Sequence, residues 1–341
     1  MKASVLEDED RNTREVRAPR GTSRWRKQLD ERASFLVACA LLIGLVAVYG
    51  SLRKGVFSFE ELNLDTAAAM TLLLAASGQT VVLLRGGIDL SIGGIISLGT
   101  VLAATRFGHH PQTAAFWTFL IIAMGLLVGA ANGLIIAVLE LQPFLVTLTT
   151  WAILSGVALI VLPTDGGSLP PGWMKFGAAS WFGLSSSVWL LIALLLFWCW
   201  FRKTRLCLAI RASGSNERSA YLSGVSLIFS DVAAYALSGT FAALASLYLT
   251  TQTGTGSPTI GNGYILPTVA AAVIGGVSLF GGRGGLVGTI VGVFIMTMIG
   301  NLVFVLSVSS YWQPVVSGVI LLLAVLASSI AEKSAKRNLL A

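Results

Sequence analysis

The chain's best candidate for a chemically active group is a lone carboxylate between two long apolar stretches. Residues 85–94 read RGGIDLSIGG, and Asp89 is their only acidic residue. An ionisable group at membrane depth normally faces the protein interior or a watery path, so Asp89 is a candidate for lining a solute path. Alternatively, it pairs with Arg85 one helical turn earlier and pins the end of a span. The glycines favour a broken helix or a close helix crossing.

Further polar or aromatic residues are set among apolar stretches and could line the same path. They are Gln79, Asn132, Phe144, Thr147, Asn301 and Gln313. A passage needs only weak, wettable contacts, which hydrogen-bonding groups and aromatic faces provide. For each residue, a helix–helix hydrogen bond or aromatic packing is an equally good interpretation.

The sequence offers little material for catalysis or metal binding. Cys39, Cys199 and Cys207 have neither paired metal spacing nor a disulfide framework. The sequence contains no phosphate-binding Gly-Lys-Ser/Thr loop, no HExxH motif and no convincing Ser-His-acid arrangement. We therefore expect no catalytic residue, no metal site and no ATP hydrolysis by this chain alone. Between residues 232 and 331 the only charged residue or histidine is Arg283, which leaves little for a proton relay.

The composition predicts that membrane-spanning helices hold these residues. The chain of 341 residues is 55% hydrophobic and only 11% charged, whereas a soluble domain of this size needs more surface charge. Its apolar stretches approach the roughly 20 residues that cross a membrane, and they lack the alternation of a transmembrane barrel. They lie at about 34–52, 63–84, 90–106, 114–139, 143–162, 187–201, 228–250, 264–282, 285–305 and 312–330. We expect an all-α polytopic bundle of about ten transmembrane helices.

The distribution of lysine and arginine predicts the orientation. With the amino terminus in the cytoplasm, the inside segments carry 19 of these residues and the outside segments carry 4. This positive-inside pattern places both termini in the cytoplasm. The net charge of +7 then reflects topology, and we expect no nucleic-acid partner. The expected organisation is a charged, disordered tail over residues 1–33, a transmembrane domain over 34–331 and a short basic tail over 332–341.

The longest predicted cytoplasmic connection, about residues 202–227, contains a short amphipathic helix. Residues 214–215 would form a flexible entry with a cap, and Gly224 would end the helix. Such a helix suits docking into the groove of a soluble partner, with Tyr221 and Leu222 as apolar anchors. An ordinary interfacial linker is the alternative. The residues assigned to this contact are Gly214, Asn216, Glu217, Arg218, Tyr221, Leu222 and Gly224.

Several motifs, in this order, resemble those of the permease subunits of binding-protein-dependent ABC sugar importers, of the ribose, arabinose and xylose group. The resemblance covers roughly residues 60–330. It rests on GGIDLS at 86–91, PFLVTL at 143–148, GSNE at 214–217, LSG at 222–224, AAVIGGVSL at 271–279, GGRG at 281–284 and SSYWQ at 309–313. Ser215 stands where a second glycine is common, and Gln142-Pro143 replaces the usual Asn-Ala, which weakens any choice of sugar.

The resemblance implies a permease of the bacterial inner membrane that imports a pentose-like sugar or a related small polyhydroxylated solute by alternating access. It implies two ATP-binding subunits that use ATP and Mg²⁺, while this chain binds no cofactor. A periplasmic or lipid-anchored sugar-binding protein would deliver the solute, and a second permease copy or paralogue would complete the pore within membrane lipid. Segment 202–227 corresponds to the coupling helix of such importers. The outer loop at 163–187, with Lys175, is a candidate docking platform for the binding protein, together with Arg53 and Lys54.

Other functions stay open at this stage. Similar permeases carry amino acids or nucleosides, and the backbone pattern alone does not exclude those solutes. An ion-coupled secondary transporter needs acidic or sodium-coordinating groups at broken helices, and Asp89 is the only fair candidate. A structural membrane scaffold would move no solute at all.

Overall fold

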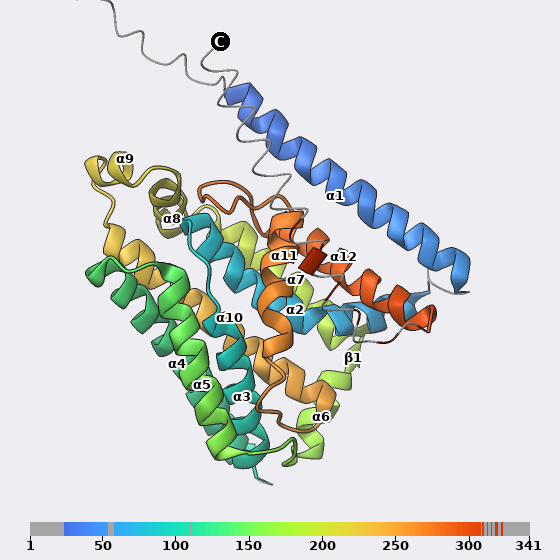
Figure 1. Ribbon diagram of the computed structural model, residues 1–341. Coiled ribbons are helices and arrows are strands. Elements are labelled where there is room, and N and C mark those ends of the chain that lie inside the picture. Colours follow the sequence, from blue (N-terminus) through green and yellow to red (C-terminus); the bar gives the residue numbers. More distant parts are fainter. Residues whose placement is uncertain are drawn as a thin grey trace, which may run out of the picture.

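The computed structural model describes residues 24–53, 58–108 and 111–307, together with residues 309, 312, 315, 318, 319 and 322. Lys54, Gln313, most of the predicted 312–330 span and the predicted tails over 1–23 and 332–341 lie outside the described residues. The described elements are helices apart from one small hairpin (Figure 1). The predicted all-α class is therefore confirmed.

The elements follow the apolar stretches of the sequence. The long helices are α1 (Arg24–Leu52), α2 (Phe59–Arg85), α4 (Pro111–Leu139), α5 (Pro143–Val161), α10 (Leu227–Thr253) and α12 (Leu286–Val305). The shorter helices are α3 (Ser91–Arg106), α6 (Pro171–Ala178), α7 (Ser186–Phe201), α8 (Arg205–Ser215), α9 (Glu217–Leu222) and α11 (Asn262–Ile274). The hairpin pairs β1 (Ser180–Trp181) with β2 (Leu184–Ser185) in antiparallel fashion.

The number of spans is smaller in the described residues than the sequence predicted. Six described helices are long and apolar enough to cross a membrane, or seven if α7 and α8, which are bent by 74°, count as one span. Helix α3 has 16 residues and α11 has 13, so both are shorter than a full span. Every predicted stretch up to residue 305 overlaps a described helix, but the count of about ten is not confirmed.

Two helix boundaries differ from the prediction. Helix α1 begins at Arg24, inside the segment predicted to be a disordered tail. Helix α11 ends at Ile274, although the apolar stretch continues to 282. The backbone amide of Gly276 caps the carbonyl of Val273, and Gly276 has a φ of 87°, which favours glycine. The apolar residues after Ile274 therefore lie in a turn.

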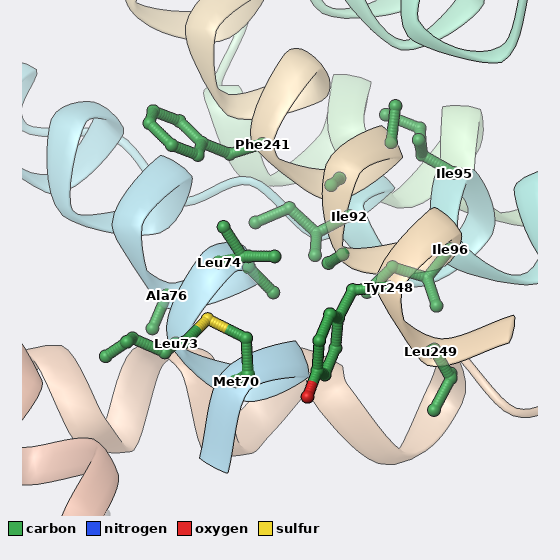
Figure 2. Packing of buried hydrophobic residues seen from close by; sticks show 14 of the residues in the cluster. Met70, Leu73, Leu74, Ala76, Ile92, Ile95, Ile96, Phe241, Tyr248 and Leu249 are labelled. Atoms are coloured by element: carbon green, nitrogen blue, oxygen red, sulfur yellow. The ribbon is translucent and has the colours of Figure 1, made fainter. Parts of the chain in front are cut away.

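The core of the bundle lies where α2, α3 and α10 meet. Figure 2 shows side chains of all three helices in one cluster, with Met70 from α2, Ile92 and Ile96 from α3, and Phe241 and Tyr248 from α10. Helix α2 runs through the centre and is mostly buried, whereas α1 lies along one flank and packs mainly against α12 (Figure 1). Helix α2 therefore packs from the centre of the bundle against α7, α8, α10, α11 and α12.

Helices α4 and α10 touch along a seam of glycines. Gly125, Gly129 and Gly133 are spaced four residues apart on α4, so they lie on one face. A Cβ atom on Gly125 would overlap the carbonyl oxygen of Gly239, and one on Gly129 would overlap that of Tyr235. Small residues at this spacing let the backbones of membrane helices approach closely. A close helix crossing is thus found here, and close approaches also occur within the 85–94 segment, where a Cβ atom would lie 3.0 Å from the carbonyl oxygen of Gly261 if added to Gly93 and 3.1 Å from that of Trp151 if added to Gly94.

The described loops gather at two ends of the bundle. One end, called the basic end here, consists of residues 84–86, 202–226 and 275–285. The backbone amide of Gly282 donates to the carbonyl of Leu84 at 2.9 Å, which joins the first and last of these segments. The other end, called the loop end, consists of residues 53, 58–63, 104–108, 162–187 and 250–256. This grouping is the same as that of the predicted inside and outside loops.

Candidate functional site

Asp89 is held by hydrogen bonds in the turn between α2 and α3. Gly86 ends α2 with a φ of 95°, which turns the chain. The Asp89 side chain is completely buried. Its Oδ1 accepts from the backbone amide of Ser91 at 2.9 Å and from the Ser91 hydroxyl at 2.5 Å, and its Oδ2 accepts from the Ser238 hydroxyl at 2.7 Å. The alternative that Asp89 pairs with Arg85 is wrong, because its partners are serines on α3 and α10.

A wider network surrounds this carboxylate. Asn132 donates to the Ser91 hydroxyl at 3.0 Å and accepts from Thr150 at 2.6 Å. The Gln79 amide, oriented to match its surroundings, donates to the backbone oxygen of Asp89 at 3.0 Å and accepts from its nitrogen at 3.3 Å. Together with Asp89, these side chains tie α2, α4, α5 and α10 to one turn. Such fully paired buried networks rigidify a core.

Four of the predicted path residues meet at this turn, whereas Phe144 and Asn301 do not. Thr147 donates to the carbonyl of Ile88 at 3.2 Å, beside Gln79, Asp89 and Asn132. Phe144 is 49% exposed on α5. Asn301 donates to Asp65 at 2.8 Å, and both Asn301 and Asp65 are outside the network. Gln313 lies outside the described residues.

The sequence analysis did not identify three members of the Asp89 region. Ser91 follows Asp89 by two residues, a spacing at which an aspartate commonly accepts a local backbone hydrogen bond, so it could have been found. Ser238 lies 149 residues away and left no local signal. Tyr235 is 1% exposed, and its hydroxyl ends against Gly87 without a hydrogen-bond partner among the described residues.

Arg85 joins three segments at the basic end. Its guanidinium lies 2.7 Å from Asp231 at the start of α10 and 2.8 Å from Glu217 at the start of α9. The side chains of Arg85 and Asp231 are only 11% and 7% exposed, whereas that of Glu217 is 63% exposed. Exposed ion pairs contribute about 0–1 kcal/mol. The bond to Glu217 can therefore break easily, while the one to Asp231 is part of the core.

The short helix predicted within 202–227 is present as α9. Asn216 caps it by accepting from the Ser219 amide at 2.8 Å, and Gly224 follows with a φ of 82°. Tyr221 and Leu222 are 68% and 77% exposed. Arg218 is also exposed.

The entry to α9 differs from the prediction. Gly214 and Ser215 belong to the last turn of α8 and form no flexible entry, and the capping residue is Asn216. The reason lies in packing, because a Cβ atom on Gly214 would overlap the carbonyl oxygen of Leu84. Helix α8 thus rests directly on the end of α2. Gly281 also packs closely against Gly214, because a Cβ atom added to Gly281 would lie 2.5 Å from the carbonyl oxygen of Gly214.

We expect the Gly214→Ala variant to be destabilised by about 1–3 kcal/mol, because overpacking forces backbone apart and the overlapping atom is a main-chain oxygen. Thermal unfolding of the purified chain measures the effect. The control is Gly156→Ala on α5, where an added Cβ meets nothing within 4 Å. That change should be neutral or stabilising by up to about 1 kcal/mol, because alanine favours helix. Equal unfolding temperatures for the two variants would contradict the close contact.

The predicted outer loop at 163–187 packs against the other segments of the loop end. Trp173 of α6 donates to Thr250 at 3.0 Å and contacts the ring of Phe107 edge-on. Lys175 on the same helix is exposed. Nearby, Arg53 donates to the Tyr49 hydroxyl at 2.8 Å, and this hydrogen bond raises the pKa of Arg53. The loop is therefore an ordered surface on which Lys175 presents positive charge, whereas the charge of nearby Arg53 is paired with Glu61 at 2.8 Å.

No group of three or more His, Cys, Asp or Glu side chains that could hold a metal ion occurs among the described residues. The free cysteines Cys39, Cys199 and Cys207 lie apart from the Asp89 network. The chemistry that the site can perform is therefore hydrogen bonding and packing within the bundle, and ion pairing at its basic end.

Comparison with known proteins gives a consistent set of relatives. A family model described as "Branched-chain amino acid transport system / permease component" matches residues 66–325. The ribose import permease protein RbsC of Escherichia coli (strain K12) is 34% identical over 296 residues, which cover 84% of this chain and 91% of that protein. RbsC of Bacillus subtilis (strain 168) is 37% identical over 261 residues, which cover 74% and 80%.

A relative with a different printed solute is also similar. The autoinducer 2 import system permease protein LsrC of Escherichia coli O9:H4 (strain HS) is 30% identical over 311 residues, which cover 89% of each chain. No solved structure matches the chain. The similarity to all three relatives extends over most of the length of both chains.

Proposed function

Because the chain belongs to the family of permease components of branched-chain amino acid-type transport systems, we propose that it imports a pentose-like sugar or a related small polyhydroxylated solute. It is a multi-pass permease of the bacterial inner membrane, of the kind found in ABC sugar importers. The observation that carries the proposal is the set of relatives, since those compared above are permeases for ribose and autoinducer 2.

Other solutes and energy sources have less support. The family description names branched-chain amino acids, but the relatives that match most of the chain favour a polyhydroxylated solute over amino acids or nucleosides. An ion-coupled mechanism would need an acidic group free to bind an ion. Asp89 is completely buried and already accepts three hydrogen bonds, so it is a poor candidate for that task.

The proposed energy source is ATP hydrolysed by two partner subunits at the basic end, which is taken to face the cytoplasm. Exposed Tyr221 and Leu222 would insert into a groove of each ATP-binding subunit, with Glu217 and Arg218 at the rim of the contact. The partners would bind ATP and Mg²⁺. This chain would then be a transport subunit without an enzymatic site of its own.

The proposed route of coupling runs from α9 through Arg85 into the centre of the bundle. Arg85 ends α2 and contacts both Glu217 and Asp231. Four residues further along, the Asp89 network ties the same turn to α4, α5 and α10. A push on α9 therefore reaches four helices through one turn, which suits rigid-body alternating access.

The solute path is proposed to follow the wall that this network builds. Gln79, Asp89, Asn132 and Thr147 are closed to solvent in this arrangement, so they would shape the path without touching the solute. Phe144 is more accessible and could offer an apolar face to a sugar ring. Asn301 is a weaker candidate because it pairs with Asp65.

The test of the proposed function is reconstitution. The permease, co-purified with its ATP-binding subunits, is placed in lipid nanodiscs, and candidate sugar-loaded binding proteins are added. ATPase turnover that rises with one loaded protein supports the importer and names its sugar. Uptake that follows an ion gradient, with no associated ATPase, would contradict it. Stimulation that is unchanged in Lys175→Glu would rule out the docking surface on the outer loop.

We expect Glu217→Arg to uncouple ATP hydrolysis from transport while the protein remains folded and inserted. The change sets two guanidinium groups beside each other and drives α9 away from the end of α2, but it removes only an exposed ion pair. Transport should fall at least tenfold, with an unfolding temperature close to that of the parent. The matched control is Glu217→Gln, which keeps a hydrogen-bond acceptor and should retain most transport. Equal activity of both variants would show that the Arg85 contact is not used.

A further inference from the structure

A cavity lies at the basic end, apart from the Asp89 network. It has a volume of about 460 Å³ and is bordered by α1, α7, α8 and the glycine-rich turn before α12. Three of its lining side chains are cations, namely Arg202, Lys203 and Arg211. Phe35, Trp198 and Leu208 form an apolar side. The cavity thus joins a positively charged region to an apolar one at the end of membrane-spanning helices.

Among the described residues, no acidic side chain neutralises the positive charge of this cavity. No described carboxylate lines it, and the ion pairs of the described residues involve Arg53 and Arg85. Arg211 donates from Nη2 to the carbonyl of Gly284 at 2.7 Å, and its guanidinium also contacts the Cys207 thiol. Its Nε is buried and has no hydrogen-bond partner among the described residues. Buried donors without acceptors are costly, so an anion near Arg211 would be stabilised.

The apolar side restricts what the anion can be. Phe35 comes from α1, which is long enough to cross a membrane, and Trp198 comes from α7, which is long enough only when it is counted together with α8. Arg202 and Lys203 directly follow the last residue of α7 and are exposed, which is the place of residues at the membrane surface. Basic pockets between transmembrane helices on the cytoplasmic side bind the head groups of anionic lipids. A free phosphate would leave the apolar side unused.

We propose that this cavity binds an anionic phospholipid, with its phosphate among Arg202, Lys203 and Arg211 and an acyl chain along Phe35 and Trp198. The leaflet concerned is the cytoplasmic one, in keeping with the predicted orientation. The same cavity is bordered by the turn that packs on Gly214, so a bound lipid holds α8 and that turn together. The lipid thereby sets the position from which α9 is presented.

The experiment titrates the full chain, purified in a mild detergent, with phosphatidylglycerol or phosphatidylcholine and counts bound lipid by native mass spectrometry. Phosphatidylglycerol should bind more tightly than phosphatidylcholine. Arg211→Gln should weaken phosphatidylglycerol binding about fivefold, as expected for one lost cation near a phosphate. The matched control is Arg205→Gln, which removes an exposed cation from α8 that does not line the cavity. It should change the affinity less than about twofold.

Three outcomes would overturn the proposal. Equal losses in Arg211→Gln and Arg205→Gln would mean that only general surface charge attracts the lipid. Equal binding of the two lipids would remove the role of charge. Displacement of phosphatidylglycerol by inorganic phosphate at millimolar concentration would identify the ligand as a free phosphate. If Arg211→Gln does not fold, Arg202→Gln/Lys203→Gln tests the same cavity, because both side chains are exposed and without ion partners.

Discussion

Replacing Arg85 by methionine is expected to lower the free energy of unfolding by about 3–5 kcal/mol. The substitution keeps the apolar stem of the side chain but leaves Asp231, whose side chain is 7% exposed, as a buried carboxylate without its cation. Removing one partner of a buried pair costs far more than the pair itself contributes, because the remaining charge is not compensated. Thermal or chemical unfolding of the purified permease measures the loss.

The double variant Arg85→Met/Asp231→Leu distinguishes this explanation from a simple loss of packing. Replacing both partners by apolar groups should restore most of the stability, since no unpaired charge remains. Glu217→Ala should cost about 0–1 kcal/mol, because Glu217 is exposed. A double variant that is no more stable than Arg85→Met would contradict the account. Even a fully stable double variant should transport poorly, because α9 has lost its contact with α2.

Replacing Asp89 by alanine is expected to cost about 3 kcal/mol or more and to abolish transport. Three buried donors lose their acceptor, namely the amide and hydroxyl of Ser91 and the hydroxyl of Ser238. Each unsatisfied buried donor costs about 1–3 kcal/mol, although a serine hydroxyl can find a carbonyl of its own helix. The turn between α2 and α3 would also lose its tie to α10. Unfolding and uptake by reconstituted vesicles measure the two effects.

Asp89→Asn is the matched variant for this prediction. The amide keeps one acceptor oxygen for Ser91, and the Ser238 hydroxyl can turn to accept from the amide nitrogen. The loss should therefore be about 1 kcal/mol, since most hydrogen bonds are kept. An alanine variant as stable as the parent would show that the three hydrogen bonds only offset the cost of burying the carboxylate. An asparagine variant as damaged as alanine would show that the charge itself is needed.

The sequence was a good guide to local features of this bundle. Continuous apolar stretches predicted helices, and each stretch up to residue 305 overlaps one. The small α9 helix and its end at Gly224 were recognisable because left-handed glycines act within a few residues, although the cap was predicted at residues 214–215 and is Asn216. The glycines at 85–94 predicted a broken helix or a close helix crossing for the same reason.

Contacts between segments that are far apart in the sequence could not be predicted from such local patterns. The partners of Asp89 and Arg85 include Ser238 and Asp231, which lie 149 and 146 residues away. An apolar stretch of sequence indicates that a segment enters the membrane. It does not indicate how far the segment extends across the membrane or which residues the segment contacts. For that reason Gly214 was predicted as flexible, although it is fixed by contact with Leu84. The end of α11 at Ile274 was missed because apolar residues continue beyond it.

The placement of α1 has a consequence for how the protein is made. Helix α1 packs mainly against α12, whose first residue, Leu286, is synthesised long after Leu52. At synthesis rates of about 5–20 residues per second, α1 enters the bilayer roughly 10–50 s before its partner. It must therefore persist alone among lipids during that time, and exposed Leu36, Val37 and Ile43 suit it to do so. Its docking on α12 is then a late step of biogenesis, after the bundle centred on α2 has formed.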